Sequence, residues 1–427
     1  MSATKVVVRP IPDCVAALVL SAKPANLTQF LETAPEIAQL KRSYQALAAQ
    51  HAAQPGSIEF VEYDDVAGDS HDRVNAKEVL GYHYATFCQP EFWLKEPRTK
   101  PVVDDLDLQL TASITGDFAE GRRIADKLAI ERPDDSRAAF NRGWYELMDG
   151  KVELGYSLMH RGRRVEIFGD RKCNSSRPVW NGEKGVVMLV LEGGLGDQLH
   201  QVRYAANLVA KGCSVVISCT PNLAGVLKDV AGVSAIVQHG MEGAVYHEYW
   251  MPAMSAPMFL KMQLQDICGK PYIPRPDVPA HEGVRIGLRW SGNKEFEAQH
   301  HKLFPPQPFF DAVKRERVTF VSLQRDADTQ FKPDWVQNVC LDTWEDTRQA
   351  VASCDLVITS CTSVSHLAAG MGVPTWVVLP AMAYFLYALP GETTPYYDSM
   401  RLFRQKAFGD WSHPMQELKK ALEVYTS

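Results

Sequence analysis

The sequence lacks the features that would place a protein outside the cytoplasm. Its 427 residues include nine scattered cysteines, an odd number, with no Cys-x-x-Cys pair among them. This usage argues against a disulfide-stapled domain and indicates reduced thiols. No apolar run approaches the roughly 18 residues of a membrane span, and no apolar segment of signal-peptide length follows Lys5. We therefore expect a soluble cytoplasmic protein.

An excess of basic charge is also missing. The formal net charge is −6 and the isoelectric point is near 6.1, which argues against a large nucleic-acid-binding surface but leaves a local basic groove open. A hydrophobic fraction of 46% and a charged fraction of 22% are ordinary for a globular chain. The length suits two or three domains, so the function has to be sought in motifs.

Residues 1–100 carry the weakest signals and are treated as a poorly legible region of mixed and helical character. Val6–Val8 favours a short strand, and one or two helices are expected between Leu27 and Ala49. His83 and Cys88 are candidate metal ligands, but two isolated ligands are too few, and core packing is the preferred interpretation. We expect no metal site.

Residues 101–175 contain a helical repeat. Gly116-Asp-Phe-Ala-Glu-Gly121 recurs as Gly150-Lys-Val-Glu-Leu-Gly155, and the offset of 34 residues is the tetratricopeptide period. Two repeats are marginal alone, so they should pack on residues 1–100 and on the next domain. Recognition of an acceptor or partner and a purely structural collar both remain open as roles. The basic cluster Arg161–Arg164 fits a solvated helix end better than a phosphate site.

Strands alternate with helices in residues 176–275 and again in 276–410, which predicts two doubly wound α/β units. The strands expected in them are Val186–Leu191, Ser214–Ser218, Ala235–Gln238, Val284–Trp290, Val318–Leu323, Asp355–Thr359 and Thr375–Leu379. The expected helices are 198–210, 222–229, Met251–Leu264, Phe309–Lys314, Trp344–Ser353 and Thr362 to Met371. Four prolines in Pro271–Pro279 predict a stiff connector. A helix in 411–427 is expected to cross back to the first unit.

The glycine turn after the first of these strands is the most informative stretch. Glu192-Gly-Gly-Leu-Gly-Asp197 ends the strand, and a helix begins near Asp197. The turn allows a ligand to approach the backbone through Gly193, Gly194 and Gly196. Asp197 is expected at the carboxyl end of the strand, where open α/β sheets bind ligands.

Two other interpretations of this turn compete with a catalytic one. Dinucleotide binding fits poorly, because Leu199 occupies the position of the third glycine. A role for Asp197 as a helix cap alone remains open.

Four motifs follow one another along the chain: Glu192–Asp197, Trp290-Ser-Gly-Asn293, Ser322-Leu-Gln324 and Thr362-Ser-Val-Ser-His-Leu-Ala-Ala-Gly-Met-Gly-Val-Pro374. In this order they resemble the ADP-heptose:lipopolysaccharide heptosyltransferase family, glycosyltransferase family 9, and especially its bacterial relatives with tetratricopeptide repeats ahead of the transferase. Arg177-Pro-Val-Trp-Asn-Gly182 and Arg401-Leu-Phe-Arg-Gln405 also resemble that subgroup. The resemblance covers about residues 105–425.

The resemblance implies an α/β fold of the GT-B type, in which two Rossmann-like domains face a cleft behind a helical repeat region. The domain at 176–275 would bind the acceptor, and the domain at 276–410 would bind the nucleotide sugar. The implied activity is inverting, metal-independent sugar transfer to an acceptor hydroxyl, with no cofactor besides the nucleotide-sugar co-substrate.

Asp197 occupies the family's base position, and a carboxylate base suits a reaction in which the attacking hydroxyl loses a proton. The helix after Thr362 and the cation Lys302 would stabilise the leaving diphosphate. The positions implied for donor binding are Ser291, Gly292, Asn293, Lys302, Gln324, Cys361, Thr362, Ser363 and His366.

The sequence departs from the family at two places. Cys361 stands where the family commonly has Asp, and Tyr384-Phe-Leu-Tyr387 lacks a cation often found there. A second hypothesis is therefore a catalytically decayed scaffold or binding protein. A nucleotide-dependent oxidoreductase is a third, and the missing glycine argues against it. The sequence leaves open the donor sugar and whether the acceptor is a protein, a glycan or a modified nucleic-acid base.

Overall fold

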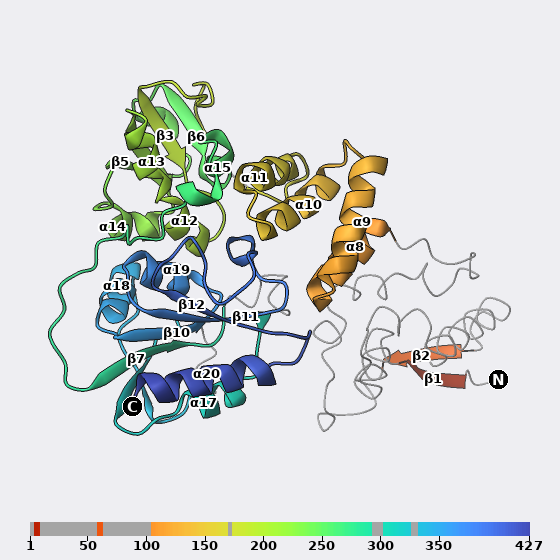
Figure 1. The fold of residues 1–427 in the computed structure, drawn as a ribbon, viewed down its shortest axis with the longest axis vertical. Helices are drawn as coiled ribbons and strands as arrows, with labels where there is room; N and C mark the ends of the chain where they lie inside the picture. The colour runs from red at the N-terminus through yellow and green to blue at the C-terminus, as the bar shows by residue number, and fades with distance from the viewer. Residues whose placement is uncertain (1–3, 9–57, 63–103, 170–172, 293–301, 326–331) are drawn as a thin grey trace. The chain divides into compact units, whose positions relative to one another are not determined.

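The computed structural model describes residues 4–8, 58–62, 104–169, 173–292, 302–325 and 332–427 (Figure 1). The chain forms two compact units, Met1–Asp104 and Asp105–Ser427. In the first unit, β1 (Thr4–Val8) pairs in parallel with β2 (Ile58–Glu62). The strand expected at Val6–Val8 is therefore present, and β2 was not predicted. The helices expected between Leu27 and Ala49, and the residues His83 and Cys88, lie outside the described residues.

Four helices open the second unit: α8 (Asp105–Thr115), α9 (Phe118–Glu131), α10 (Ser136–Met148) and α11 (Val152–His160). Each pair turns at a glycine in the left-handed region, Gly116 with φ +89° and Gly150 with φ +77°, where a side chain would be strained. The repeated glycines thus mark two helical hairpins. Their assignment to the tetratricopeptide class stays a prediction.

The first α/β sheet is parallel, with strand order β5-β4-β3-β6. Its strands are β3 (Val186–Val190), β4 (Ser214–Cys219), β5 (Val233–Gln238) and β6 (Tyr249–Pro252). The helices around it are α12 (Leu195–Gln201), α13 (Tyr204–Ala210), α14 (Ala224–Leu227) and α15 (Ala256–Phe259). The expected helix at 198–210 is therefore two helices, and the one at 222–229 is a 3₁₀ turn followed by α14.

The interpretation of Met251–Leu264 as one helix is wrong at both ends, because α15 is confined to Ala256–Phe259. Tyr249–Pro252 forms β6, which pairs with β3, and α15 begins only at Ala256. An apolar run without alternation does not distinguish a buried strand from a buried helix. Pairing with the central strand decided the outcome here.

The second sheet is also parallel, with order β12-β11-β10-β7-β8-β9. Its strands are β7 (Val284–Arg289), β8 (Val318–Ser322), β9 (Val336–Gln337), β10 (Leu356–Ser360), β11 (Thr375–Leu379) and β12 (Met400–Arg404). Numbered along the chain from β7, this is the doubly wound order 3-2-1-4-5-6, in which ligands bind at the point between strands 1 and 4. That point lies between β7 and β10. The edge strands β9 and β12 were not predicted.

Helices α17 (Pro306–Val313), α18 (Trp344–Ala352), α19 (Ser363–Gly370) and α20 (Ser412–Tyr425) cover this sheet. The sequence predicts that the last helix crosses back to the first α/β unit. Instead, α20 packs mainly on α17 and β12 of the second sheet. Met415, Leu418 and Leu422 belong to the same apolar cluster as Phe309 of α17. The apolar face of α20 is therefore buried against the second sheet and its helices.

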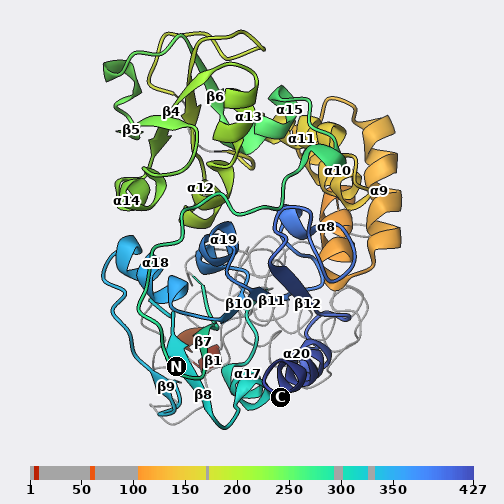
Figure 2. The same cartoon turned by 60° about the vertical axis from the view of Figure 1, so that its left-hand side comes forward.

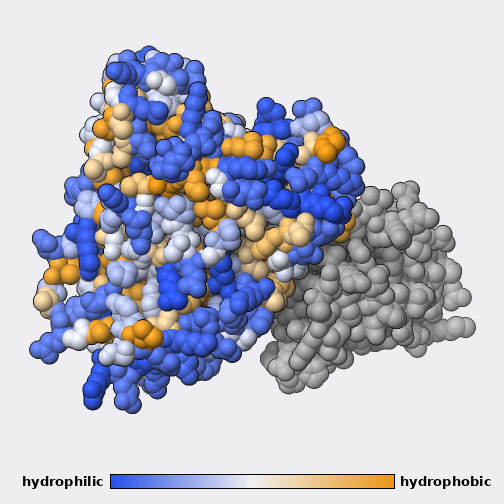
Figure 3. Space-filling view, viewed as in Figure 1, coloured by the Kyte–Doolittle hydropathy of each residue, from blue (hydrophilic) through white to orange (hydrophobic). Residues whose placement is uncertain are grey.

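The two sheets meet through α12 and α19, which lie against one another between them (Figures 1 and 2). The helical hairpins join the same core: Trp144 Nε1 donates to the carbonyl of Ala383 at 3.1 Å, and the Tyr156 and Tyr396 hydroxyls are 3.1 Å apart. The expectation that the repeats pack on the following region is confirmed. On the described part of the face in Figure 3, apolar residues form small separate groups among hydrophilic ones. No helix in the described part of the chain could span a membrane.

Candidate active site

The glycine turn after β3 holds Asp197 in a defined place. Gly193 has φ +71°, and a Cβ on it would lie 2.7 Å from Oδ2 of Asp197, so only glycine fits. Gly194 caps α12, and Asp197 is the third residue of that helix. Asp197 Oδ2 accepts a hydrogen bond from the Gly194 N–H at 2.8 Å. Asp197 therefore does cap its helix, but with one carboxylate oxygen only.

The other carboxylate oxygen faces the second α/β unit. Tyr384, which follows β11, donates its hydroxyl to Asp197 Oδ1. Both side chains belong to half-buried residues. Burial, followed by the negative charge of Asp197, raises the pKa of Tyr384 well above its usual value. The phenol therefore keeps its proton at neutral pH and acts as the donor of this hydrogen bond.

Gly196 lets α12 and α19 come together. A Cβ at this position would lie 3.0 Å from Cδ2 of His366 and 3.1 Å from Cα of Ser363. These distances are tighter than ordinary van der Waals contact, so any side chain would push the helices apart. The glycine thus brings the Asp197 turn beside the first turn of α19.

The N-terminus of α19 follows β10 at the switch point of the second sheet. Thr362 is its N-cap residue, and the Thr362 hydroxyl lies 3.2 Å from that of Thr359 instead of capping the helix. Ser363 is the first helical residue. Because first-turn N–H groups have no acceptor within a helix, and because the helix dipole is positive at this end, the position favours an anion.

Lys302 and Cys361 complete the charged surroundings. Lys302 Nζ lies 5.6 Å from the ring centroid of Tyr384. Burial raises the pKa of the half-buried Cys361 thiol, the charge of Lys302 lowers it, and the charge of Asp197 adds to the rise. Cys361 therefore stays a neutral thiol between a cation and a carboxylate.

The turn after β7 is braced from the neighbouring strand. Gln324 follows β8, and its Oε1 accepts the backbone N–H groups of Trp290 at 3.3 Å and Ser291 at 3.1 Å. Ser291 and Gln324 are each only 4% exposed. These contacts fix the position of Ser291 and Gly292 at the carboxyl end of β7. Asn293 lies outside the described residues.

His366 is buried in an aromatic cluster behind the first turn of α19. Its Nδ1 lies 2.9 Å from the Tyr397 hydroxyl, and its ring is parallel to that of Tyr387 within 8°. Burial, helped by the charges of Arg203 and Lys302, lowers the pKa of His366 to about 3. The imidazole is therefore neutral at physiological pH. Its part in donor binding stays a prediction.

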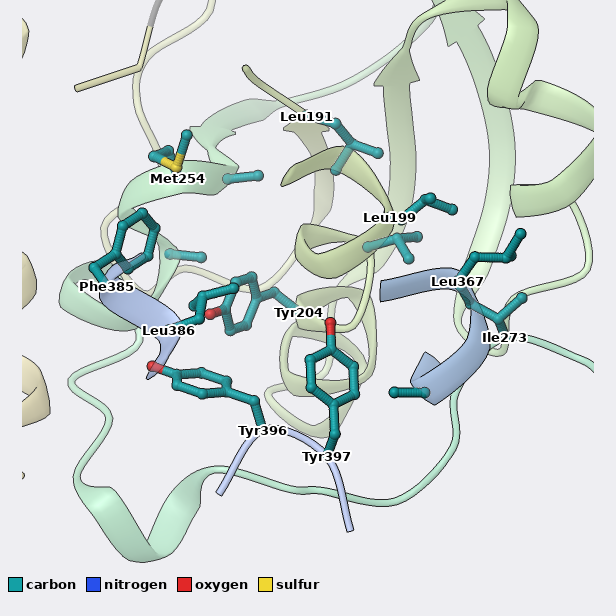
Figure 4. Packing of buried hydrophobic residues seen from close by; sticks show 14 of the residues in the cluster. Leu191, Leu199, Tyr204, Met254, Ile273, Leu367, Phe385, Leu386, Tyr396 and Tyr397 are labelled. Atoms are coloured by element: carbon teal, nitrogen blue, oxygen red, sulfur yellow. The ribbon is translucent and has the colours of Figure 1, made fainter. Parts of the chain in front are cut away.

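Sequence reasoning missed the residues that fill the space between the two α/β units. The Arg203 guanidinium lies 4.4 Å from the ring centroid of Tyr272 and 4.5 Å from that of Tyr397, and its Nη1 donates to the Tyr396 carbonyl at 2.7 Å. Figure 4 shows Tyr396 and Tyr397 beside Tyr204 in this cluster. No spacing signal links these positions, which are far apart in the chain. The aromatic content around Tyr384 was the only available hint.

Glu192, the first residue of the glycine motif, has a structural role. It is fully buried, and its two carboxylate oxygens pair with Nη1 and Nη2 of Arg163 at 2.6 and 2.5 Å. Arg163 is therefore neither part of a solvated helix end nor a phosphate ligand. No three His, Cys, Asp or Glu side chains among the described residues gather into a possible metal site.

The chain matches no protein-family model and no curated protein sequence. Among solved structures, it is similar to the iron-containing dodecameric glycosyltransferase TibC of enterotoxigenic E. coli, with 11% identity, 56% of this chain and 66% of TibC covered, and a TM-score of 0.39. It is similar to E. coli ADP-heptose lipopolysaccharide heptosyltransferase II, with 13% identity, 57% and 99% covered, and a TM-score of 0.39. It is also similar to a family 9 glycosyl transferase from Veillonella parvula, with 11% identity, 58% and 98% covered, and a TM-score of 0.41.

Proposed function

We propose that this protein is a glycosyltransferase of the GT-B type that moves a sugar from a nucleotide-sugar donor to a hydroxyl of an acceptor, with inversion and without a required metal. The observation that carries the proposal is the placement of Asp197 opposite the N-terminus of α19, across the contact between the two α/β units, which we call the seam. One α/β unit supplies a carboxylate, and the other supplies a site that favours an anion.

The chemistry follows from these two groups. The acceptor hydroxyl attacks the anomeric carbon and forms the new C–O bond, while its proton passes to the Asp197 carboxylate. The bond between the anomeric carbon and the diphosphate oxygen breaks, and the diphosphate leaves with the electron pair. The first turn of α19 and Lys302 stabilise the charge that develops on it. Attack opposite the leaving group inverts the anomeric configuration.

The switch point of the second sheet suits the donor. Ser291 and Gly292 stand at the carboxyl end of β7, and Thr362 and Ser363 stand at the end of the neighbouring β10. Open α/β sheets bind nucleotides at this kind of position. The diphosphate would lie against the first turn of α19, and the sugar would face Asp197.

The test is a panel of ADP-, UDP-, GDP- and TDP-sugars incubated with candidate acceptors and read by mass spectrometry of the product. Asp197→Asn should lower turnover of the accepted donor at least about 100-fold, since a positioned general base contributes on that order. Asp229→Asn, a change at an exposed carboxylate, is the matched control and should keep wild-type turnover. Near wild-type turnover by Asp197→Asn would refute the base assignment.

A decayed scaffold is the second candidate, and the observation that favours it is a neutral thiol at Cys361 where the resembling family commonly has a carboxylate. Titration calorimetry with the four classes of nucleotide sugar separates the two. Binding of at least one class supports a working donor site. Failure of all four to bind supports the scaffold.

A further inference from the structure

The hydrogen bond between Tyr384 and Asp197 joins two α/β units that are formed by different parts of the chain. Asp197 belongs to the turn between β3 and α12, and Tyr384 lies between β11 and the 3₁₀ turn Phe385–Tyr387. The carboxylate is thus held by a backbone N–H of its own unit on Oδ2 and by a phenol of the other unit on Oδ1. Its orientation depends on both units being in place.

The segment that carries Tyr384 is itself fixed. The Tyr384 carbonyl accepts the Tyr387 N–H at 2.7 Å, and the Ala383 carbonyl accepts Nε1 of Trp144 from α10 at 3.1 Å. The Ala381 N–H donates to Oε1 of Gln405 at 3.2 Å. Three hydrogen bonds, two of them from side chains outside the segment, therefore fix the backbone that carries the phenol, as a residue that orients another group requires.

We propose that Tyr384 is the positioning residue of the base: its hydroxyl holds the Asp197 carboxylate in the orientation and the ionised state that proton acceptance needs, and it does so only when the two α/β units are together. The inference rests on the proposed function and deepens it. It makes the orientation of the base depend on contact between the two α/β units.

The electrostatic surroundings are consistent with this role. Tyr384 donates to Asp197, the charge of Asp197 acts on the Cys361 thiol, Lys302 lies over the Tyr384 ring, and His366 lies beside Gly196. Burial keeps the pKa of the thiol high and that of the imidazole low, so both are neutral. A hydrogen bond to the ionised form of a carboxylate favours that form and lowers its pKa. Tyr384 therefore offsets part of the cost of placing a charge in a half-buried seam.

The test compares wild type with Tyr384→Phe, which keeps the ring and loses only the hydroxyl. We expect kcat to fall about tenfold with the donor KM within twofold of wild type, and the acid limb of the pH profile to move to higher pH by about one unit. Tyr425→Phe is the matched control, because Tyr425 lies on α20 with its hydroxyl 3.2 Å from the Asp355 carbonyl. It should keep the wild-type kcat and pH profile. Thermal melting checks that each variant is folded.

A second readout does not need activity. In protein labelled with ¹³C at the aspartate carboxyl carbons, the resonance lost in Asp197→Asn identifies Asp197, and its titration should lie at higher pH in Tyr384→Phe than in wild type. Replacing Tyr384 by 3-fluorotyrosine, a more acidic phenol of nearly the same size, should move the titration to lower pH. This variant keeps the hydroxyl and serves if Tyr384→Phe does not fold.

The outcomes separate the two proposals. Coincident Asp197 titrations in wild type and in both variants would overturn the role of Tyr384, whatever the activity. If no nucleotide sugar is consumed, or if Asp197→Asn turns over like wild type, the proposed transfer fails, and a shifted titration still shows that Tyr384 holds the carboxylate. If Asp197→Asn is inactive and Tyr384→Phe has wild-type kcat and pH profile, the inference alone fails.

Discussion

Arg163 and Glu192 form a two-pronged ion pair that ties the end of the helical hairpins to the glycine turn. Their oxygen–nitrogen distances are 2.6 and 2.5 Å, and the Glu192 side chain is fully buried while Arg163 is 19% exposed. The Glu192 Oε2 also accepts the Met254 N–H at 3.0 Å. The pair therefore positions the segment that leads to Asp197, and it makes the hairpins part of the α/β core.

Arg163→Met should destabilise the protein by about 3 kcal/mol, because removing one partner leaves a buried carboxylate without its counter-charge. The measurement is the urea midpoint followed by tryptophan fluorescence. Arg123→Met is the control, since its ion pair with Glu120 lies on the exposed face of α9 and should contribute nothing measurable. Equal midpoints for the two variants would show that the buried pair does not stabilise this junction.

Gly196→Ala should lower transfer about tenfold and stability by about 1 kcal/mol. The added methyl group meets His366 and the backbone of Ser363 at about 3 Å, so α12 and α19 must separate, and small displacements of reacting groups are costly. Gly225→Ala in α14 is the matched control, because no atom lies within 4 Å of its Cβ position. Coupled-enzyme kinetics and thermal melting measure both effects. Wild-type activity in Gly196→Ala would contradict the close approach.

Stability should fall as the pH drops below 6.5. His366 has a folded-state pKa of about 3 against an ordinary value of 6.5, so the unfolded chain takes up the proton first. The contribution of neutral His366 is complete above pH 6.5 and is lost between 6.5 and 3, at up to about 1.4 kcal/mol per pH unit. His200, whose pKa burial lowers well below its usual value, acts in the same direction.

The corresponding measurement is the urea midpoint at several pH values from 7 to 4. His366→Gln removes one titrating group, so its midpoint should depend less steeply on pH than that of wild type. His413→Gln, on α20 away from the seam, should keep the wild-type slope. If the urea midpoint had the same dependence on pH in wild type and in His366→Gln, His366 would not be held neutral in the folded protein.

Trp144→Phe should loosen the segment that carries Tyr384. The change removes the hydrogen bond to the Ala383 carbonyl and leaves a buried acceptor without its partner, which costs about 1 to 3 kcal/mol. We expect faster amide hydrogen exchange in residues 381–388 and a lower kcat. If exchange became faster only in α10, the hairpins would not hold the segment that carries Tyr384.

The strands and their turns could be predicted closely because local patterns encode them. The buried runs at β3, β4, β7 and β10 are apolar and β-branched, and a glycine or a capping residue follows each of them. The failures have a common cause. β6, β9 and β12 are short edge strands whose assignment depends on pairing with a neighbour, and α20 could have covered either sheet, since its amphipathic face does not specify a partner.

The sequence by itself determined the positions of the glycines, the carboxylate at 197 and the helix start at 362, because backbone conformation and capping are local properties. Only the tertiary structure decided that α12 lies against α19, that Arg163 neutralises Glu192, and that Tyr384 reaches Asp197. Those contacts join residues up to 187 positions apart, and such pairs form through packing of two sheets around a shared core, for which no local pattern exists.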